Sequence, residues 1–162
     1  MITLVLGGAR SGKSDVAERL AGLGRAVTYI ATGVVTDPDM EIRIAAHRDR
    51  RPPTWATVEA GRDLPRALRA ARGPVLVDSL GTWLAGFEDF AADADELVSA
   101  LTDRADHTVV VSEEVGLGVH PSTEIGRRFR DALGLVNQRV AAVADDVVLV
   151  VAGRVLRLER AP

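Results

Sequence analysis

Residues 7–14, Gly-Gly-Ala-Arg-Ser-Gly-Lys-Ser, have the residue types and spacing of a phosphate-binding loop, G-x-x-x-x-G-K-S. Its glycines allow backbone amides to turn inward on a phosphate without a Cβ in the way. The Lys13 ammonium can reach the terminal phosphates of a nucleoside triphosphate, and the Ser14 hydroxyl is a natural Mg²⁺ ligand. An apolar run precedes the loop and a helical stretch follows it, which disfavours the alternative of a glycine-rich turn with an incidental lysine. The segment therefore predicts a site for a nucleoside triphosphate.

Asp78 is an acidic residue that fits the same chemistry. It ends the apolar run Pro74-Val75-Leu76-Val77, at the point where a buried strand would reach the carboxyl edge of a parallel sheet. In phosphate-loop proteins a carboxylate there holds Mg²⁺ or its water shell opposite the loop serine. The alternative is that Asp78 caps the following helix, and the two roles are compatible. Ser14 and Asp78 are thus the predicted metal ligands.

His47 is the histidine whose surroundings suggest catalysis. It shares one helical face with Met40 and Ile44, and arginines stand at positions 48, 50 and 51. A neutral imidazole can attack a phosphorus centre, and nearby arginines can stabilise the charge on a departing pyrophosphate. The alternative is a histidine satisfied within the core. His107 and His120 have no comparable neighbourhood.

Short runs rich in Val, Ile and Leu alternate with helical patterns along the chain. This alternation predicts an α/β fold with a mainly parallel sheet covered by helices on both faces. The predicted strands are 2–6, 26–30, 74–78, 108–112 and 146–152, and the predicted helices are 13–23, 37–50, 64–71, 92–104 and 122–144. Residues 147–152 and 155–159, joined by Gly153-Arg154, predict an antiparallel strand at one edge of the sheet.

Composition limits the classes of function. The 162 residues predict a single domain, 1–162, with 47% hydrophobic and 27% charged residues. A net charge of −3 gives no general attraction to nucleic acid or to an anionic membrane, and the absence of cysteine excludes disulfides. The apolar run 147–152 is too short to span a bilayer, and the N-terminus lacks a signal-peptide layout. We therefore expect a cytoplasmic protein with neither a membrane span nor a nucleic-acid partner.

Several motifs occur together in a fixed order. They are the loop at 7–14, Tyr29-Ile30-Ala31-Thr32, the spaced pattern Met40…Arg43-Ile44…His47-Arg48…Arg51-Pro52…Trp55…Glu59, Glu114–Val119 with Pro121, Phe129-Arg130-Asp131, and Val136-Asn137-Gln138-Arg139 with Ala141. In this order, over nearly the whole chain, the sequence resembles the bifunctional adenosylcobinamide kinase/adenosylcobinamide-phosphate guanylyltransferase family.

The resemblance implies a RecA-like phosphate-loop NTPase fold, a homotrimer and a two-step transferase. Adenosylcobinamide is phosphorylated, and GMP from GTP is then transferred to its phosphate through a guanylyl-histidine at His47. The substrates are GTP, with ATP possible for the kinase step, and the corrinoid; Mg²⁺ is the metal. His47 and Lys13 are the implied catalytic residues. The implied nucleotide-binding residues are Gly7, Gly8, Ala9, Arg10, Ser11, Gly12, Lys13, Ser14, Thr32, Gly33, Val34, Arg48, Asp49, Arg50, Arg51, Glu59 and Asp78.

The chain departs from this pattern in three places. Glu113 stands where asparagine is expected, His120 replaces an apolar residue before Pro121, and the segment between Asp78 and Thr108 is shorter than usual. The short segment bears on contacts to the large corrinoid and therefore on the kinase half. Two other functions stay open: a simpler phosphate-loop kinase in which His47 is structural, and a RecA-like ATP-binding switch or assembly protein. For a DNA-bound motor of that second kind, the acidic balance of the chain is unfavourable.

Overall fold

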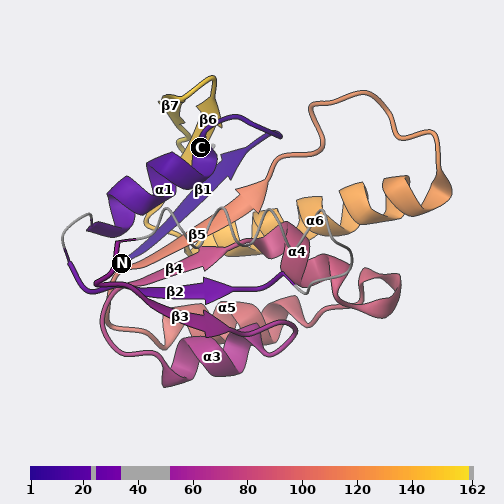
Figure 1. Ribbon diagram of the computed structural model, residues 1–162. Coiled ribbons are helices and arrows are strands. Elements are labelled where there is room, and N and C mark those ends of the chain that lie inside the picture. The colour runs from indigo at the N-terminus through magenta and orange to yellow at the C-terminus, as the bar shows by residue number, and fades with distance from the viewer. Residues whose placement is uncertain (23–24, 34–51, 161–162) are drawn as a thin grey trace.

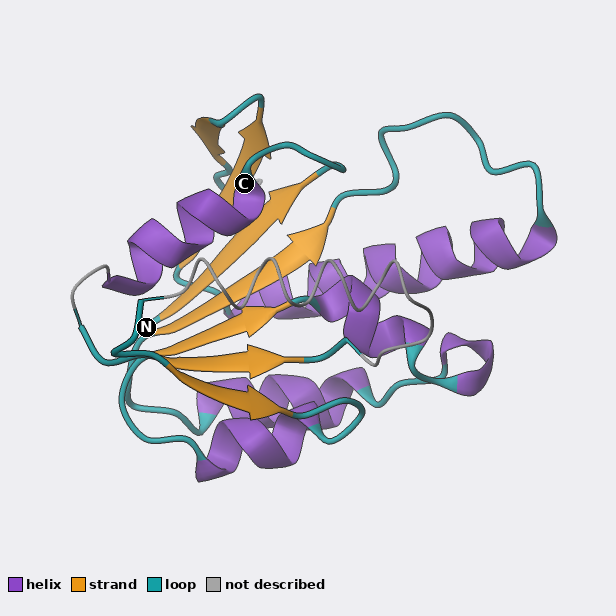
Figure 2. Ribbon diagram, viewed as in Figure 1, coloured by secondary structure: helices purple, strands orange, loops and turns teal. Residues whose placement is uncertain are grey.

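One sheet organises the part of the chain that the structure describes, residues 1–22, 25–33 and 52–160 of a computed structural model. Its seven strands follow the order β3-β2-β4-β5-β1-β6-β7 (Figures 1 and 2). All neighbouring strands are parallel except β6 and β7, which form an antiparallel hairpin. The strands are β1 (Ile2–Gly7), β2 (Thr28–Ala31), β3 (Ala56–Glu59), β4 (Val75–Asp78), β5 (Thr108–Glu113), β6 (Asp146–Val151) and β7 (Arg154–Arg157).

Helices cover both faces of this sheet, because side chains along each strand alternate between two apolar layers. Val5 packs on the side of α1, whereas Leu4 and Leu6 pack on the side of the remaining helices. The helices are α1 (Lys13–Gly22), α3 (Leu64–Ala70), α4 (Leu80–Ala85), the 3₁₀ turn η1 (Glu88–Phe90), α5 (Ala94–Thr102) and α6 (Glu124–Val143). The predicted α/β architecture, with its mainly parallel sheet, helices on both faces and antiparallel edge strand, is confirmed.

Some boundaries differ from the sequence-based expectations. The two-residue turn between β6 and β7 is Ala152-Gly153, one residue earlier than predicted, and both residues have positive φ, 49° and 73°. Hairpin turns of this kind match the twist of the flanking strands, and glycine suits them. The strand β3 and the short elements α4 and η1 were not among the predicted elements. The predicted helix 37–50 lies outside the described residues.

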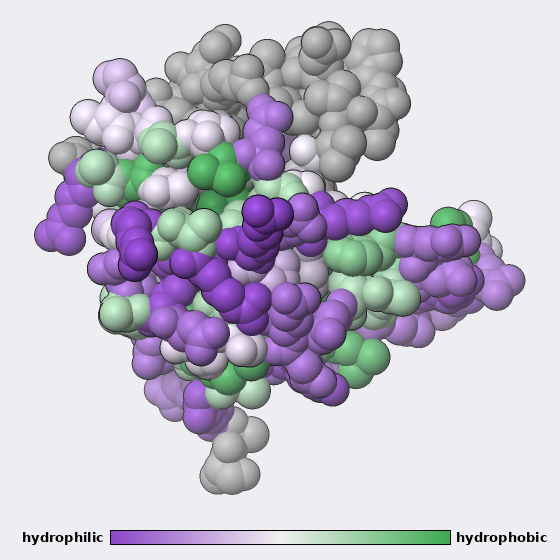
Figure 3. Space-filling model, turned by 90° about the horizontal axis from the view of Figure 1, so that it is seen from below, coloured by the Kyte–Doolittle hydropathy of each residue, from purple (hydrophilic) through white to green (hydrophobic). Residues whose placement is uncertain are grey.

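The surface that carries α3 and α5 is mainly hydrophilic, with apolar side chains in small separate patches (Figure 3). This distribution agrees with the buried apolar layer between these helices and the sheet. In the ranges that the structure describes, none of the helices has the length and apolar character that a bilayer crossing would need.

Candidate functional site

The carboxyl ends of five strands meet at one edge of the sheet. Gly7 on β1 pairs with Glu113 on β5, while Ala31 on β2 pairs with Asp78 on β4 and with Glu59 on β3. The loop after β1 leaves the sheet at this edge and enters α1 (Figure 1). In open α/β sheets, ligands bind outside the carboxyl ends of the strands. Residues far apart in sequence are thereby brought to the loop that was predicted to bind phosphate.

The phosphate loop has a backbone conformation and close contacts that require glycine at some positions. Gly12 has φ +88°, and a Cβ there would lie 3.3 Å from the Cα of Gly153. A Cβ at Gly7 would lie only 2.9 Å from the carbonyl oxygen of Val150. A Cβ at Gly8, by contrast, would meet no described atom within 4 Å. The glycines at 7 and 12 therefore allow close packing beneath the loop, whereas no described residue covers the side of Gly8.

Two distant segments support the loop from behind. The Gly153 N–H in the β6–β7 turn donates to the Ser11 carbonyl at 2.8 Å, and the Glu114 N–H donates to the Gly7 carbonyl at 3.1 Å. The Ser11 hydroxyl is buried and has no hydrogen-bond partner within the described ranges. Sequence reasoning missed the role of Gly153, because the hairpin was identified only as a sheet edge.

Lys13, the predicted phosphate-binding cation, begins α1. Its Nζ donates to the Gly8 carbonyl at 3.4 Å and lies 3.9 Å from Oε1 of Glu113. Helix α1 adds the partial positive charge of its N-terminus to that of the ammonium. The loop thus presents a cation and helix N–H groups on the side where terminal phosphates would bind.

Asp78 has a partner that fixes its carboxylate. The buried Tyr29 hydroxyl donates to Oδ2 of Asp78 at 2.8 Å. The alternative that Asp78 caps the next helix is wrong, since the N-cap of α4 is Ser79, whose hydroxyl accepts from the Thr82 N–H. The N-cap is one residue later because Asp78 still pairs within the sheet.

The donor set of Ser14 and Asp78 fits Mg²⁺. Ser14 lies in the first turn of α1, directly after the loop, and Asp78 lies at the end of β4, two strands from β1 at the same edge of the sheet. Within the residues that the structure describes, no group of three or more His, Cys, Asp or Glu side chains could hold a metal. Hydroxyl and carboxylate oxygens are ligands that Mg²⁺ accepts, and this ion completes its shell with water and substrate phosphates.

The remaining predicted residues are distributed unevenly. The buried Thr32 hydroxyl donates to the Ser79 carbonyl at 2.6 Å and contacts Thr82 Oγ1, so its side chain connects β2 to the start of α4. A Cβ at Gly33 would meet no described atom within 4 Å. Glu59 ends the edge strand β3, level with Asp78 on the other side of β2. The residues predicted at Val34, His47, Arg48, Asp49, Arg50 and Arg51 lie outside the described ranges.

Asn137 is a further residue of structural importance at this edge. It is buried on α6, accepts from the Ser112 hydroxyl at 2.6 Å and donates to the Glu113 carbonyl at 3.1 Å. These bonds hold the end of β5 beside the phosphate loop. The signal available in the sequence was the motif Val136-Asn137-Gln138-Arg139, which by itself does not show what the amide contacts.

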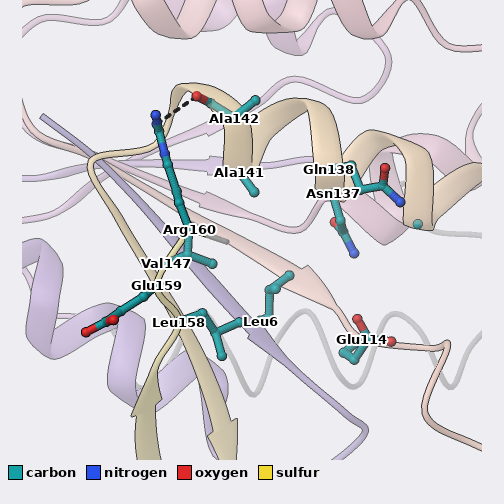
Figure 4. Close-up of a pocket in the computed structure, with 11 residues that line it drawn as sticks. Leu6, Glu114, Asn137, Gln138, Ala141, Ala142, Val147, Leu158, Glu159 and Arg160 are labelled. Carbon is teal, nitrogen blue, oxygen red and sulfur yellow. Dashed lines mark hydrogen bonds between the residues drawn. The ribbon is translucent and has the colours of Figure 1, made fainter. Parts of the chain in front are cut away.

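A groove of about 770 Å³ lies away from the phosphate-binding side of the loop. It is bordered by α6, by Leu6 and Val147 of the sheet, and by the C-terminal segment (Figure 4). Arg160 closes one end by donating to the Ala142 carbonyl at 2.8 Å. Lys13 and Asp78 are not among its lining residues, so it is separate from the phosphate-loop site.

Comparison with known proteins agrees with this geometry. Residues 3–158 match the family model described as cobinamide kinase / cobinamide phosphate guanyltransferase. The chain belongs to this family. It is accordingly an enzyme of the transferase class, and the phosphate-loop pattern at residues 7–14 lies within the matched range.

Relatives and a solved structure extend the comparison. The bifunctional adenosylcobalamin biosynthesis protein CobU of Salmonella typhimurium is 41% identical over 175 residues, covering 94% of this chain and 97% of the relative. CobP of Pseudomonas aeruginosa, which carries the same description, is 40% identical over 172 residues and covers 100% and 99% of the two chains. Among solved structures, the P4 protein of bacteriophage phi6 in complex with ADP aligns with a TM-score of 0.47 at 18% identity, covering 96% of this chain and 53% of that one.

Proposed function

We propose that this enzyme acts in adenosylcobalamin biosynthesis, phosphorylating adenosylcobinamide and then converting the product to adenosylcobinamide-GDP with GTP. The observation that carries the proposal is the family match over residues 3–158, combined with the phosphate loop, Lys13 and Asp78 at one sheet edge. Family membership makes a RecA-like switch or assembly protein unnecessary as an explanation. The remaining alternative is a phosphate-loop kinase that lacks guanylyl transfer, and the labelling experiment below distinguishes it from the proposed enzyme.

In the first step, the aminopropanol hydroxyl of adenosylcobinamide attacks the γ-phosphorus of GTP or ATP. An O–P bond forms, the bond between the γ-phosphorus and the β-phosphate oxygen breaks, the hydroxyl proton passes to water, and a nucleoside diphosphate leaves. Lys13 neutralises charge on the terminal phosphates. Ser14 and Asp78 would hold Mg²⁺, and the ion would neutralise charge on the phosphate oxygens.

In the second step, the His47 imidazole attacks the α-phosphorus of GTP and pyrophosphate leaves. Arg48, Arg50 and Arg51 stabilise the charge that develops on the pyrophosphate. The phosphate of adenosylcobinamide phosphate then attacks the phosphoramidate, which frees the imidazole and gives adenosylcobinamide-GDP. The support for this step is the position of His47 in the motif that the family resemblance rests on, together with the chemistry of imidazole as a nucleophile.

Labelled GTP distinguishes the two-step enzyme from a simple kinase. With α-labelled GTP and Mg²⁺, label should remain on the denatured protein, and γ-labelled GTP should leave none. The bond should be acid-labile and alkali-stable, as a phosphoramidate is and a serine or threonine ester is not. Labelling that persists in His47→Ala would remove His47 from the mechanism, and a wild-type protein that never labels would favour the simple kinase.

A further inference from the structure

Glu113 is a second carboxylate beside the phosphate loop, and neither step described above uses it. It ends β5 in register with Gly7, the first residue of the loop pattern. Its backbone carbonyl accepts from the buried Asn137 amide at 3.1 Å, so the residue is fixed to α6 as well as to the sheet. The backbone therefore holds this side chain at the level of the phosphate site.

The carboxylate itself is also held. Its oxygens accept from the Ser79 hydroxyl at 2.9 and 3.0 Å, and Oε2 accepts from the Gly81 N–H at 3.0 Å. A Cβ at residue 81 would collide with Oε2, so the absence of a side chain at Gly81 makes room for the carboxylate. Donors from two residues fix its position, and the group cannot simply swing away when an anion approaches.

Lys13 is the cation that faces this carboxylate. Oε1 of Glu113 lies 3.9 Å from Nζ of Lys13, and the two side chains are only 29% and 13% exposed. In the part of the chain that the structure describes, no other carboxylate lies within ion-pair distance of Lys13. Partial burial weakens screening by salt, so this interaction is stronger than that of an exposed pair.

A terminal phosphate and Glu113 must therefore share one ammonium. Lysine of a phosphate loop contacts the β- and γ-phosphates. A γ-phosphate bound to Lys13 would lie close to the fixed negative charge of Glu113. A nucleoside diphosphate has no γ-phosphate and would place less negative charge beside this carboxylate. The repulsion is electrostatic and grows with the charge of the third phosphate.

We propose that Glu113 is a positioning and specificity-determining residue of the phosphate loop. Its fixed carboxylate keeps the Lys13 ammonium at the loop before nucleotide binds, and it lowers the affinity for a triphosphate relative to a diphosphate. The inference rests on the proposed function only in that Lys13 contacts the terminal phosphates. It concerns this chain in particular, because the family resemblance predicts asparagine at this position.

Calorimetric titration of the full chain with GTP and with GDP, in Mg²⁺ and without corrinoid, tests the inference. In Glu113→Gln the Kd for GTP should fall by about tenfold and the Kd for GDP by no more than about threefold. Glu113→Asp restores the charge and should bring the ratio of the two constants back toward the wild-type value. If the role of Glu113 were purely structural, the substitution would raise the Kd for GTP and the Kd for GDP by the same factor or leave both unchanged. The ratio of the two constants would then stay the same.

Two further variants complete the test. Glu113→Asn carries the residue that the resemblance expects, and it replaces Glu113→Gln if that protein fails to fold. Glu114→Gln removes the same charge from the next residue, whose carboxylate accepts from the Gly116 N–H, and should leave the ratio unchanged. A GTP-to-GDP ratio within twofold of wild type in a folded neutral variant overturns the inference. The titration needs neither corrinoid nor His47, so its failure and a failure of the labelling experiment are distinguishable.

Discussion

At the scale of single residues, the proposed function has one phosphate loop serving both steps, so both should depend on Lys13. Lys13→Ala should abolish kinase and guanylyl transfer alike and weaken nucleotide binding by roughly tenfold to a hundredfold, the value of a charge-assisted hydrogen bond. Arg19→Ala removes an exposed cation from the last turn of the same helix and is the matched control. Turnover assays on both variants test this dependence, and circular dichroism checks that each variant is folded. Substantial turnover by folded Lys13→Ala would mean that chemistry occurs elsewhere.

His107 should make folding stability depend on pH. Burial lowers the pKa of its imidazole below 6.5, the nearby N-terminal ammonium lowers it further, and Asp146 and Asp145 oppose both effects. The unfolded chain therefore binds the proton more readily, and stability is complete above about pH 6.5 and falls as the pH drops toward the folded-state pKa.

Urea unfolding at pH 7.5 and pH 5.5 measures this contribution. His107→Gln, which keeps a polar group near its partner Thr3, should lose less stability between these two pH values than the wild type does. An equal loss in both proteins would show that other groups carry the acid sensitivity.

At the scale of elements, Arg104 joins the end of α3 to the start of β5. Its guanidinium donates to the carbonyls of Leu68, Ala71 and Gly73 at 2.6, 2.8 and 2.6 Å, and to the Thr108 hydroxyl at 2.9 Å. The last carbonyl groups of a helix have no hydrogen-bond donors within the helix, and the guanidinium provides donors for them. Arg104→Ala should lower the free energy of unfolding by about 3 kcal/mol, because hydrogen bonds to a charged group are lost and partly buried carbonyls are left unpaired.

Arg69 provides the comparison for this prediction. It lies on α3 and forms exposed ion pairs with Glu96 at 3.2 Å and Asp103 at 3.6 Å. Such pairs contribute little, so Arg69→Ala should cost less than about 1 kcal/mol in the same urea experiment. Similar losses in the two variants would contradict the role given to Arg104.

The sequence predicts those elements whose signal is local. Strands β1, β4 and β5 are apolar runs because both of their faces are covered, and the phosphate loop and Asp78 follow directly from them. Strand β3 was not predicted because all four of its residues are exposed at the sheet edge, so no apolar run marks it. The contacts of Tyr29, Glu113 and Gly153 depend on which strands become neighbours, and periodicity along one chain does not determine that order.

At the scale of the whole molecule, the hairpin at the end of the sheet carries exposed apolar side chains. Val151, Val155 and Leu156 are 60%, 51% and 59% exposed, and large apolar side chains left exposed at a sheet edge are available for contact with another subunit. The family resemblance implies three subunits. We therefore expect light scattering at micromolar concentration to give the mass of three 17.2 kDa chains. A monomer or a dimer would contradict this expectation.

At the scale of the whole enzyme, we propose that one nucleotide site performs both reactions and that His47 serves only the second. In that proposal the γ-phosphorus, attacked in the kinase step, would bind beside Lys13, whereas guanylyl transfer requires attack at the α-phosphorus. The most direct measurement is product analysis of His47→Ala supplied with adenosylcobinamide, GTP and Mg²⁺. The variant should accumulate adenosylcobinamide phosphate and form adenosylcobinamide-GDP at a rate several powers of ten below wild type, as expected when a covalent nucleophile is lost. Equal loss of both activities in a folded variant, or retention of both, would contradict the account.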